Sequence, residues 1–280
     1  MSDATLQDFS YFLGGVRPVQ TDSSVLVSSS KYLNEPAIRE WIATQFLRRN
    51  GPDLPSASDT SNGLIPALAK IRDDDRLDRL IAAEKATNDK FRAWLERKPI
   101  CRHTLEDFAR YAPGTLGGVY HRHVVDNGFQ LNLGWTFPDM GDDREYMLFR
   151  SGQIHDFDHI LTGGGFDTLG ELLPFFLRMS NLHAHMSQEL ASELFPVHVF
   201  GGLRMAFRSA LHYPATWLTV LDLMQRGFSI GLNSGCLLMA DFESAFHLPL
   251  DEARKALGVV GAEDVDTAAT SRIFDGIAPG

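Results

Sequence analysis

The chain has 280 residues, of which 44% are hydrophobic and 22% charged, and its formal net charge is -10. This composition is typical of a soluble globular protein, and the acidic balance argues against sequence-independent nucleic-acid binding, which needs a basic surface. It also argues against docking on anionic lipid by charge alone, so any contact with a membrane surface would have to be apolar.

The two cysteines, Cys101 and Cys236, are too few for a disulfide framework, and we expect reduced thiols in a cytoplasmic setting. Residues 1–20 lack the basic region and apolar core of a secretory signal, and they are acidic and poor in Arg, unlike a mitochondrial transit peptide. No apolar run approaches the roughly eighteen residues that span a bilayer. We therefore expect a cytoplasmic chain that is either soluble or peripheral on the inner membrane.

The first part of the chain is predicted to be an irregular segment followed by helices. Residues 1–33 show no clear period and contain the polar run TDSSVLVSSS, which predicts an N-terminal arm. Apolar side chains at helical spacing in 36–49 predict a helix, with Pro near its start and Asn-Gly after its end. Composition predicts a loop over 51–63, and the separate charged and apolar faces of 64–98 predict one or two helices.

The middle and C-terminal parts of the chain are also predicted to be helical. A short helix should end at Pro113-Gly114, and Thr115 is an apt N-cap for a second helix that stops at Asn127-Gly128. A helix over 143–161 should end at the three glycines 163–165. The remaining predicted helices cover 168–194, 203–229 (with Pro214 expected to kink or split it) and 249–257.

Alternation of period two, the pattern of half-buried strands, is nearly absent from the sequence. We therefore predict an all-α fold with a single mostly helical domain over residues 34–265. The irregular arm at 1–33 precedes this domain, and a C-terminal tail at 266–280 follows it.

The predicted helix over 143–161 contains His155, Asp156 and His159, and Glu171 follows twelve residues after His159. On a helix each residue turns about 100°, so His159 projects about 40° from His155, and Asp156 lies on the side toward His159. Two imidazoles and a carboxylate suit a divalent transition metal. Glu171 could reach back from the next helix as another ligand, because the glycines allow a tight reversal.

Ordinary interpretations of the same residues stay open. A His pair four residues apart also occurs by chance, and Asp156 and Asp158 would suit a solvated helix face. Thr168-Leu-Gly-Glu171 matches a capping box, in which the Glu171 side chain bonds the N-cap amide and not a metal. Asp158, on the other flank of His155, also competes with Asp156 as a ligand.

The motif is not a zinc-protease signature, because that signature is H-E-x-x-H with the Glu as general base, and Asp156 stands at the Glu position. A His-Asp metal phosphohydrolase is a more serious alternative, since such enzymes use an adjacent His-Asp pair. They also need an earlier His and a later Asp, for which His121, His123 and Asp222 are the candidates. The sequence contains no G-x-S-x-G nucleophile motif.

The sequence contains 19 Phe against 6 Tyr, and several of these rings gather in its centre. Core packing accounts for most of them, and the excess also suits a pocket or face for a long apolar ligand. Burial of each methylene group of such a ligand is worth about 0.8 kcal/mol.

The sequence resembles the coenzyme Q biosynthesis protein 4 family over roughly residues 65–260. The hallmark of that family is H-D-x-x-H followed, after eleven residues, by E, and it stands here as His155, Asp156, His159 and Glu171. Flanking segments agree as well: YAPGTLGGVYHRHVVDNG lies upstream, and RGFSIGLNSGCLLMADFESAFHLPLDEARKALGV lies downstream.

The resemblance has departures that suit a divergent bacterial member. Tyr111 and Ala112 stand where the family usually has Leu-Pro, and Phe242 replaces the usual Trp before Glu243. These departures bear on the substrate more than on the metal site.

The resemblance implies an α-helical protein that holds a divalent metal ion beside an apolar ligand cavity for a polyprenylated lipid. His155, Asp156, His159 and Glu171 would be both the metal ligands and the catalytic residues, with zinc the first choice and manganese, iron or cobalt the alternatives. The implied activity is oxidative decarboxylation of a polyprenylated hydroxybenzoate ring in ubiquinone biosynthesis, which leaves a hydroxyl at the same ring carbon.

The implied partners are a polyprenylated quinone precursor or another isoprenoid lipid, other quinone-biosynthesis enzymes and the membrane surface, with no nucleic acid. A homo-oligomer stays open. Two other functions also stay open: a non-catalytic prenyl-lipid-binding scaffold of the quinone biosynthetic complex and, ranked last, the His-Asp metal phosphohydrolase.

Overall fold

The structure is a computed structural model that describes residues 28–50, 63–128 and 141–276. Within these ranges the chain is helical and has no strand, and the only β-type pairings are isolated bridges, Thr115 with Pro249 and Gly164 with Val265. The prediction of an all-α fold is therefore confirmed. None of the helices in the described ranges is both long and apolar enough to span a bilayer.

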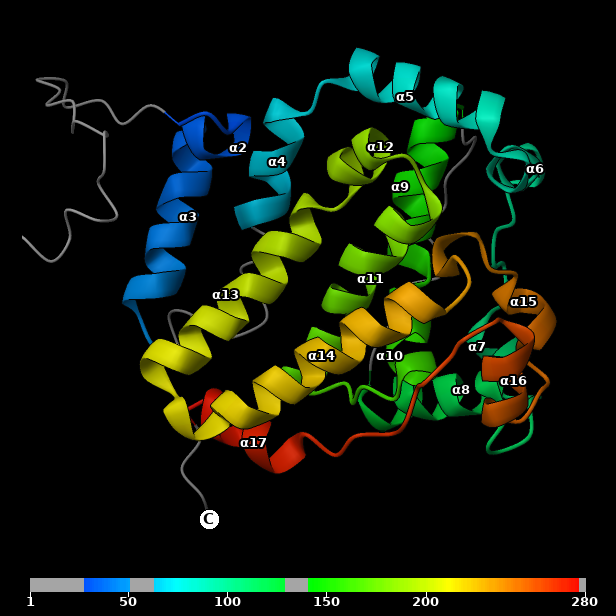
Figure 1. Cartoon of the computed structure of the whole chain (residues 1–280). Coiled ribbons are helices and arrows are strands. Elements are labelled where there is room, and N and C mark those ends of the chain that lie inside the picture. The colour runs from blue at the N-terminus through cyan, green and yellow to red at the C-terminus, as the bar shows by residue number, and fades with distance from the viewer. Residues whose placement is uncertain (1–27, 51–62, 129–140, 277–280) are drawn as a thin grey trace, which may run out of the picture.

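Figure 1 shows the helices in chain order. Those before the His motif are α2 (Lys31–Asn34), α3 (Pro36–Leu47), α4 (Ile65–Ile71), α5 (Asp74–Thr87), α6 (Asp89–Arg97), α7 (Leu105–Phe108), α8 (Leu116–Asp126) and α9 (Asp143–Gln153). Those from the motif onward are α10 (His155–Thr162), α11 (Leu172–His185), α12 (Gln188–Leu194), α13 (Pro196–His212), α14 (Trp217–Asn233), α15 (Phe242–Ala245), α16 (Leu250–Ala256) and α17 (Ala268–Phe274). Short 3-10 turns are η3 (Leu169–Glu171), η4 (Pro214–Thr216) and η5 (Leu237–Met239).

Helices α11 and α14 pack against each other at the centre of the molecule, and small residues on α14 allow the close approach. A Cβ atom on Gly231 would lie 2.0 Å from the Ser180 Oγ atom, so only glycine fits at this crossing. The Asn181 side chain also joins the two helices, because its Nδ2 atom donates to the carbonyl oxygens of Gly231 and Gly235, at 2.9 Å each. This pairing fixes α11, which directly follows the turn that carries Glu171.

Two predicted helices are interrupted in the structure. The helix expected over 143–161 is divided at Ile154 into α9 and α10, so His155 begins a helix of its own. The helix expected over 168–194 becomes η3, α11 and α12. Pro174 does not break α11, because it lies in the first turn, where backbone N–H groups have no partner within the helix. Pro214 separates α13 from α14, as predicted.

The predicted arm and tail include residues that form helices. Residues 1–27 and 277–280 lie outside the described residues, whereas the end of the predicted arm enters α2 and part of the predicted tail forms α17. Phe274 of α17 is 1% exposed and belongs to an apolar core cluster with Leu169 and Tyr213. The helical unit thus extends beyond residue 265 and packs against the turn η3.

Candidate metal centre

Three of the four predicted site residues converge in the structure. His155 and His159 lie one turn apart on α10, and Glu171 ends η3. One ligand atom from each residue lies within 4.8 Å of the other two, and among the described residues no other group of three or more His, Cys, Asp or Glu does so. The Oε2 atom of Glu171 is 3.3 Å from His155 Nε2 and 3.4 Å from His159 Nε2.

The glycine-rich turn after α10 brings Glu171 back to the two histidines. Gly163 has φ of +82°, a conformation that favours glycine, and ends α10. The following chain then doubles back so closely that a Cβ atom on Gly170 would lie 1.9 Å from the carbonyl oxygen of Gly165. Glycine is therefore required at both ends of this reversal.

The buried ring of His159 is oriented by a backbone carbonyl. Its Nδ1 atom lies 2.9 Å from the Gly165 carbonyl oxygen, which can only accept a hydrogen bond. Nδ1 therefore carries the proton, and Nε2 points toward Glu171 and His155. Burial opposes protonation of His159, but the Glu171 carboxylate and the Gly165 carbonyl together raise its pKa.

Glu171 is the charged member of the group. Burial alone would raise the pKa of its carboxyl, but the charges of His159, His155 and Arg204 lower that pKa to about 2. About a third of its side chain, 32%, remains accessible because the residue borders a cavity. Glu171 is therefore an anion at any physiological pH.

The donor set fits a divalent transition metal. Two imidazole nitrogens and one carboxylate oxygen are common zinc donors, and bonds of about 2.0–2.1 Å in tetrahedral geometry separate ligand atoms by about 3.3–3.4 Å. The distances from Glu171 to the two histidines, 3.3 and 3.4 Å, agree with that spacing. His155 and Glu171 border the cavity whereas His159 is 2% exposed, so the open face of such a site is the cavity side.

Asp156 does not belong to the converging group. Its negative charge lies near Tyr120 and His123 of α8, and near His159. Burial and then this charge raise the pKa of Tyr120. That Asp156 is a metal ligand therefore stays a prediction, and the structure supports it less than it supports the other three residues.

The alternatives left open by the sequence are resolved by other contacts. Asp158 is paired with Arg178, whose Nε atom donates to Asp158 Oδ2 at 2.6 Å. The Asp158 carboxylate therefore does not face the histidines as a ligand. The capping box is not formed, because Thr168 makes no cap hydrogen bond and its hydroxyl donates instead to Asp275. The carboxylate of Glu171 lies beside the two histidines instead.

The residues required for a His-Asp phosphohydrolase are not assembled in the described part of the chain. His121 and His123 do not join the converging group. Asp222 forms an ion pair on the protein surface with Arg226, at 2.8 Å. The structure therefore gives no support to that alternative.

A cavity of about 810 Å³ opens beside the two histidines and Glu171. Its size lies in the upper part of the range for small-molecule sites, roughly 300–1,000 Å³. Most of its wall is apolar, with contributions from Ile65, Leu68, Leu77, Leu148, Phe175 and Val197. This confirms the predicted apolar cavity next to the His motif.

Three cavity residues near the candidate metal centre were not predicted from the sequence: Arg178, His198 and Arg204. Burial, with the charges of Arg178 and His155, lowers the pKa of His198 to about 3, so its imidazole is neutral. Arg178 and Arg204 are 3% and 4% exposed. A sequence signal existed for Arg178, because an Arg within the apolar run LLPFFLRMSN requires a buried partner.

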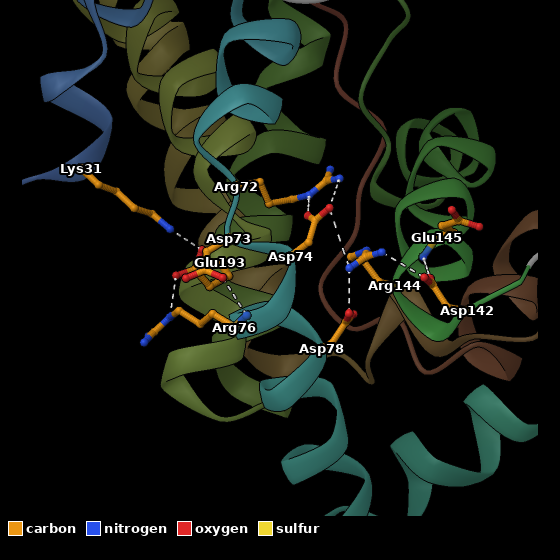
Figure 2. Close-up of polar contacts among 10 residues, drawn as sticks. All are labelled: Lys31, Arg72, Asp73, Asp74, Arg76, Asp78, Asp142, Arg144, Glu145 and Glu193. Atoms are coloured by element: carbon orange, nitrogen blue, oxygen red, sulfur yellow. Dashed lines mark hydrogen bonds and ion pairs between the residues drawn. The ribbon is translucent and has the colours of Figure 1, made fainter.

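Ion pairs join four helices near residues that line the cavity, and Figure 2 shows these pairs. Glu193 of α12 pairs with Lys31 of α2 at 2.6 Å and with Arg76 of α5 at 3.1 Å. Arg144 of α9 pairs with Asp78 of α5 at 2.8 Å. Of these residues, Lys31 and Glu193 line the cavity.

Comparison with known proteins identifies the family and the fold of the chain. The family model of coenzyme Q (ubiquinone) biosynthesis protein Coq4 matches residues 60–263. A similar solved structure is the crystal structure of a protein from Nostoc punctiforme PCC 73102 described as a candidate ubiquinone biosynthesis protein. It is 19% identical, with a TM-score of 0.55, and the match covers 82% of this chain and 100% of that chain. This likeness establishes the fold.

No curated protein sequence gives a significant match to the chain. The family model nevertheless spans the candidate metal centre and most of the residues that line the cavity. The chain therefore belongs to the coenzyme Q (ubiquinone) biosynthesis protein Coq4 family, and its role lies in ubiquinone biosynthesis.

Proposed function

We propose that the chain is a metal-dependent enzyme of ubiquinone biosynthesis, which replaces the carboxyl group of a polyprenylated hydroxybenzoate ring by a hydroxyl. The observation that carries this proposal is the position of the two histidines and Glu171 at the wall of an 810 Å³ apolar cavity. A polar reactive ring and a long apolar tail can then bind side by side.

The roles of the residues follow from their positions. His155, His159 and Glu171 would hold the ion, with zinc the first choice and manganese, iron or cobalt the alternatives. A bound divalent ion supplies a Lewis acid that stabilises negative charge as the carbon–carbon bond breaks. The Gly165 carbonyl keeps His159 in the binding tautomer, and the apolar wall binds the tail and excludes water. The reaction removes two electrons from the substrate, so it requires an external oxidant.

The test is metal analysis of the purified protein by plasma mass spectrometry. We expect near-stoichiometric metal in the wild type and its loss in the His155→Ala/His159→Ala variant. The matched control is His183→Ala/His185→Ala, because those two rings contact Gln188 and the Ser234 carbonyl and form no metal site. Absence of metal from the wild type, even after reconstitution, would contradict the proposal.

A non-catalytic lipid-binding scaffold is the second candidate, because most of the cavity wall is apolar and independent of the three polar residues. Turnover separates the two functions. If the protein is an enzyme, Glu171→Gln abolishes product formation and leaves binding of the prenylated ring intact. If the protein is a scaffold, the wild type binds the same ligand and forms no product.

Contact with a membrane surface or with other enzymes of the pathway is also part of the proposal. It is supported by exposed apolar side chains on α13 and α14, among them Phe207, Leu211 and Leu218, which are 48%, 61% and 79% exposed. We expect the wild type to co-sediment with neutral phospholipid vesicles and a Leu211→Ser/Leu218→Ser variant to do so less. Equal sedimentation of the two proteins would contradict this part.

A further inference from the structure

We infer that the C-terminal helix α17 positions the candidate metal centre, because two of its hydroxyl groups hold the turn between α10 and α11 that completes the centre. These hydroxyls belong to Thr267, at the N-cap of α17, and Ser271, and we call them the hydroxyl pair. The inference rests on the proposed function for the ion that the centre binds. It goes further because it assigns a positioning role to residues that follow the segment 60–263 matched by the family model.

The side chain of Asp167 is the part of the turn that the hydroxyl pair holds. The Thr267 hydroxyl donates to this carboxylate, with Oγ1 2.7 Å from each of its two oxygens, and the Ser271 hydroxyl donates to Oδ1. Asp167 Oδ1 also accepts from the N–H of Gly170 at 3.2 Å. A Cβ atom on Gly165 would lie 2.7 Å from Asp167 Oδ2, so the carboxylate packs directly against that glycine. The hydroxyl pair therefore acts on the backbone of the turn through one carboxylate.

Two backbone hydrogen bonds join the same segments at other points. The Leu169 N–H donates to Ser271 Oγ at 3.0 Å, so this hydroxyl both donates to the turn and accepts from it. The Val265 N–H donates to the Gly163 carbonyl oxygen at 2.9 Å. The turn is thus held at its first residue and again two residues before Glu171.

The hydroxyl pair is buried and α17 is anchored independently of it. Thr267 and Ser271 are 1% and 2% exposed, so removal of either hydroxyl leaves a hydrogen-bonding group of the turn without that partner in a site closed to solvent. Phe274, 1% exposed, belongs to the apolar core cluster that also contains Leu169. Packing of this ring fixes the helix on the core, and the hydroxyls then fix the turn on the helix.

The turn carries two groups of the candidate metal centre. The Gly165 carbonyl oxygen lies 2.9 Å from His159 Nδ1, and the Glu171 carboxylate meets both histidines. A shift of this backbone would displace the two groups together. Because the outer partners of metal ligands typically change metal affinity by roughly 10–100-fold, the hydroxyl pair should control metal affinity without touching the ion.

The test combines two measurements on the full chain. Hydrogen–deuterium exchange, read by mass spectrometry in EDTA-treated protein, reports on the amides of 163–171, and competition with a chromophoric chelator gives the zinc affinity. Thr267→Val removes one hydroxyl with little change of shape, and Ser271→Ala removes the other. We expect each variant to exchange these amides about tenfold faster and to bind zinc about tenfold more weakly. The variants are made singly, so that if one fails to fold the other decides.

Two controls separate the hydroxyls from general stability. Thr267→Ser keeps the hydroxyl and removes only a methyl group, so exchange of the turn and zinc affinity should stay within about twofold of the wild type. Ser234→Ala matches Ser271→Ala, because Ser234 is 3% exposed and its Oγ accepts from the Val260 N–H at 2.9 Å. It removes an equivalent buried contact between α14 and Val260, and both readouts should again stay within about twofold.

Four outcomes would overturn the assignment. These are unchanged exchange of the turn in Thr267→Val and Ser271→Ala, equally fast exchange in Ser234→Ala, equal effects of Thr267→Ser and Thr267→Val, and a faster-exchanging turn with unchanged zinc affinity. Failure of the wild type to bind zinc would instead contradict the proposed function, and the exchange rates would still show whether the hydroxyl pair holds the turn.

Discussion

The Nδ1 atom of His159 lies 2.9 Å from the carbonyl oxygen of Gly165, the last of the three consecutive glycines after α10. The turn therefore has two roles, because the backbone that reverses the chain also fixes the proton on the ring. The Nε2 atom of His159 is left to face Glu171 and His155. Any change that displaces the turn should thus disturb the candidate metal centre.

Gly170→Ala should displace this turn. The new Cβ would lie 1.9 Å from the Gly165 carbonyl oxygen, so the backbone must move. We expect a loss of about 2–4 kcal/mol in the free energy of unfolding and a loss of metal affinity of about tenfold or more. The control is Gly152→Ala in α9, where nothing lies within 4 Å and we expect a gain of about 0.5–1 kcal/mol. Urea unfolding measures the stability of the two variants. Equal stabilities of Gly170→Ala and Gly152→Ala would contradict the prediction.

Replacement of Glu171 and of Asp156 should affect metal content differently. Glu171 lies 3.3 Å from His155 and 3.4 Å from His159, whereas Asp156 is outside the converging group. We expect Glu171→Gln to lose the metal on dialysis and Asp156→Asn to retain it, with affinity within about tenfold of the wild type. Loss of metal from both variants would identify Asp156 as a fourth ligand.

Asp158→Asn should be strongly destabilising. Asp158 and Arg178 form an ion pair with both side chains almost fully buried, at 2% and 3% exposure. The substitution leaves a buried guanidinium without its counter-charge, which costs about 3–5 kcal/mol. The surface pair of Asp222 and Arg226 is the control, for which Asp222→Asn should cost less than about 1 kcal/mol. Similar losses of unfolding free energy for the two variants would refute the distinction.

The stability of the metal-free protein should depend on Glu171 only within a limited pH range. Because the pKa of Glu171 is lowered from 4.5 to about 2, its contribution is present above about pH 4.5 and is lost as the pH falls toward 2. His159 has a raised pKa, so its contribution is present below its ordinary pKa of 6.5 and is lost as the pH rises through the raised value. The contribution of the pair is therefore complete between about pH 4.5 and 6.5.

We therefore expect the free-energy difference between the wild type and Glu171→Gln to be largest near pH 5.5 and smaller at pH 2.5 and 8.5. Partial exposure of the Glu171 side chain limits the maximum to about 1 kcal/mol. Chemical denaturation in EDTA at the three pH values measures it. A difference that does not change with pH would show that Glu171 acts through packing and not through charge.

The helices themselves were largely predictable from the sequence, because helical periodicity and capping are local properties. Pro36 begins α3 and Thr115 caps α8, as expected. Pro174 is tolerated in the first turn of α11, since the cost of a proline depends on its place within the helix and not on its presence alone. The break at Ile154 carried no proline or turn signal of its own.

The candidate site, like the helices, was predictable from the sequence only in part. The spacing of His155 and His159 on one helix face, and the glycines that allow a reversal, are properties of the sequence alone. Whether the Glu171 carboxylate caps a helix or meets the histidines depends on tertiary contacts. In the structure it lies beside the two histidines, and the Thr168 hydroxyl donates to Asp275, more than one hundred residues away.

The sequence by itself thus determined a helical protein with two histidines on one face, an acidic surface and a chain reversal at the glycines. Tertiary packing decided which carboxylates face the histidines, because Arg178 engages Asp158 and leaves Glu171 to the centre. It also brought Arg204 of α13 against Trp41 and Gln45 of α3. Periodicity acts over a few residues, whereas the contact between Arg204 and Gln45 joins residues 159 positions apart, which only the folded core holds together.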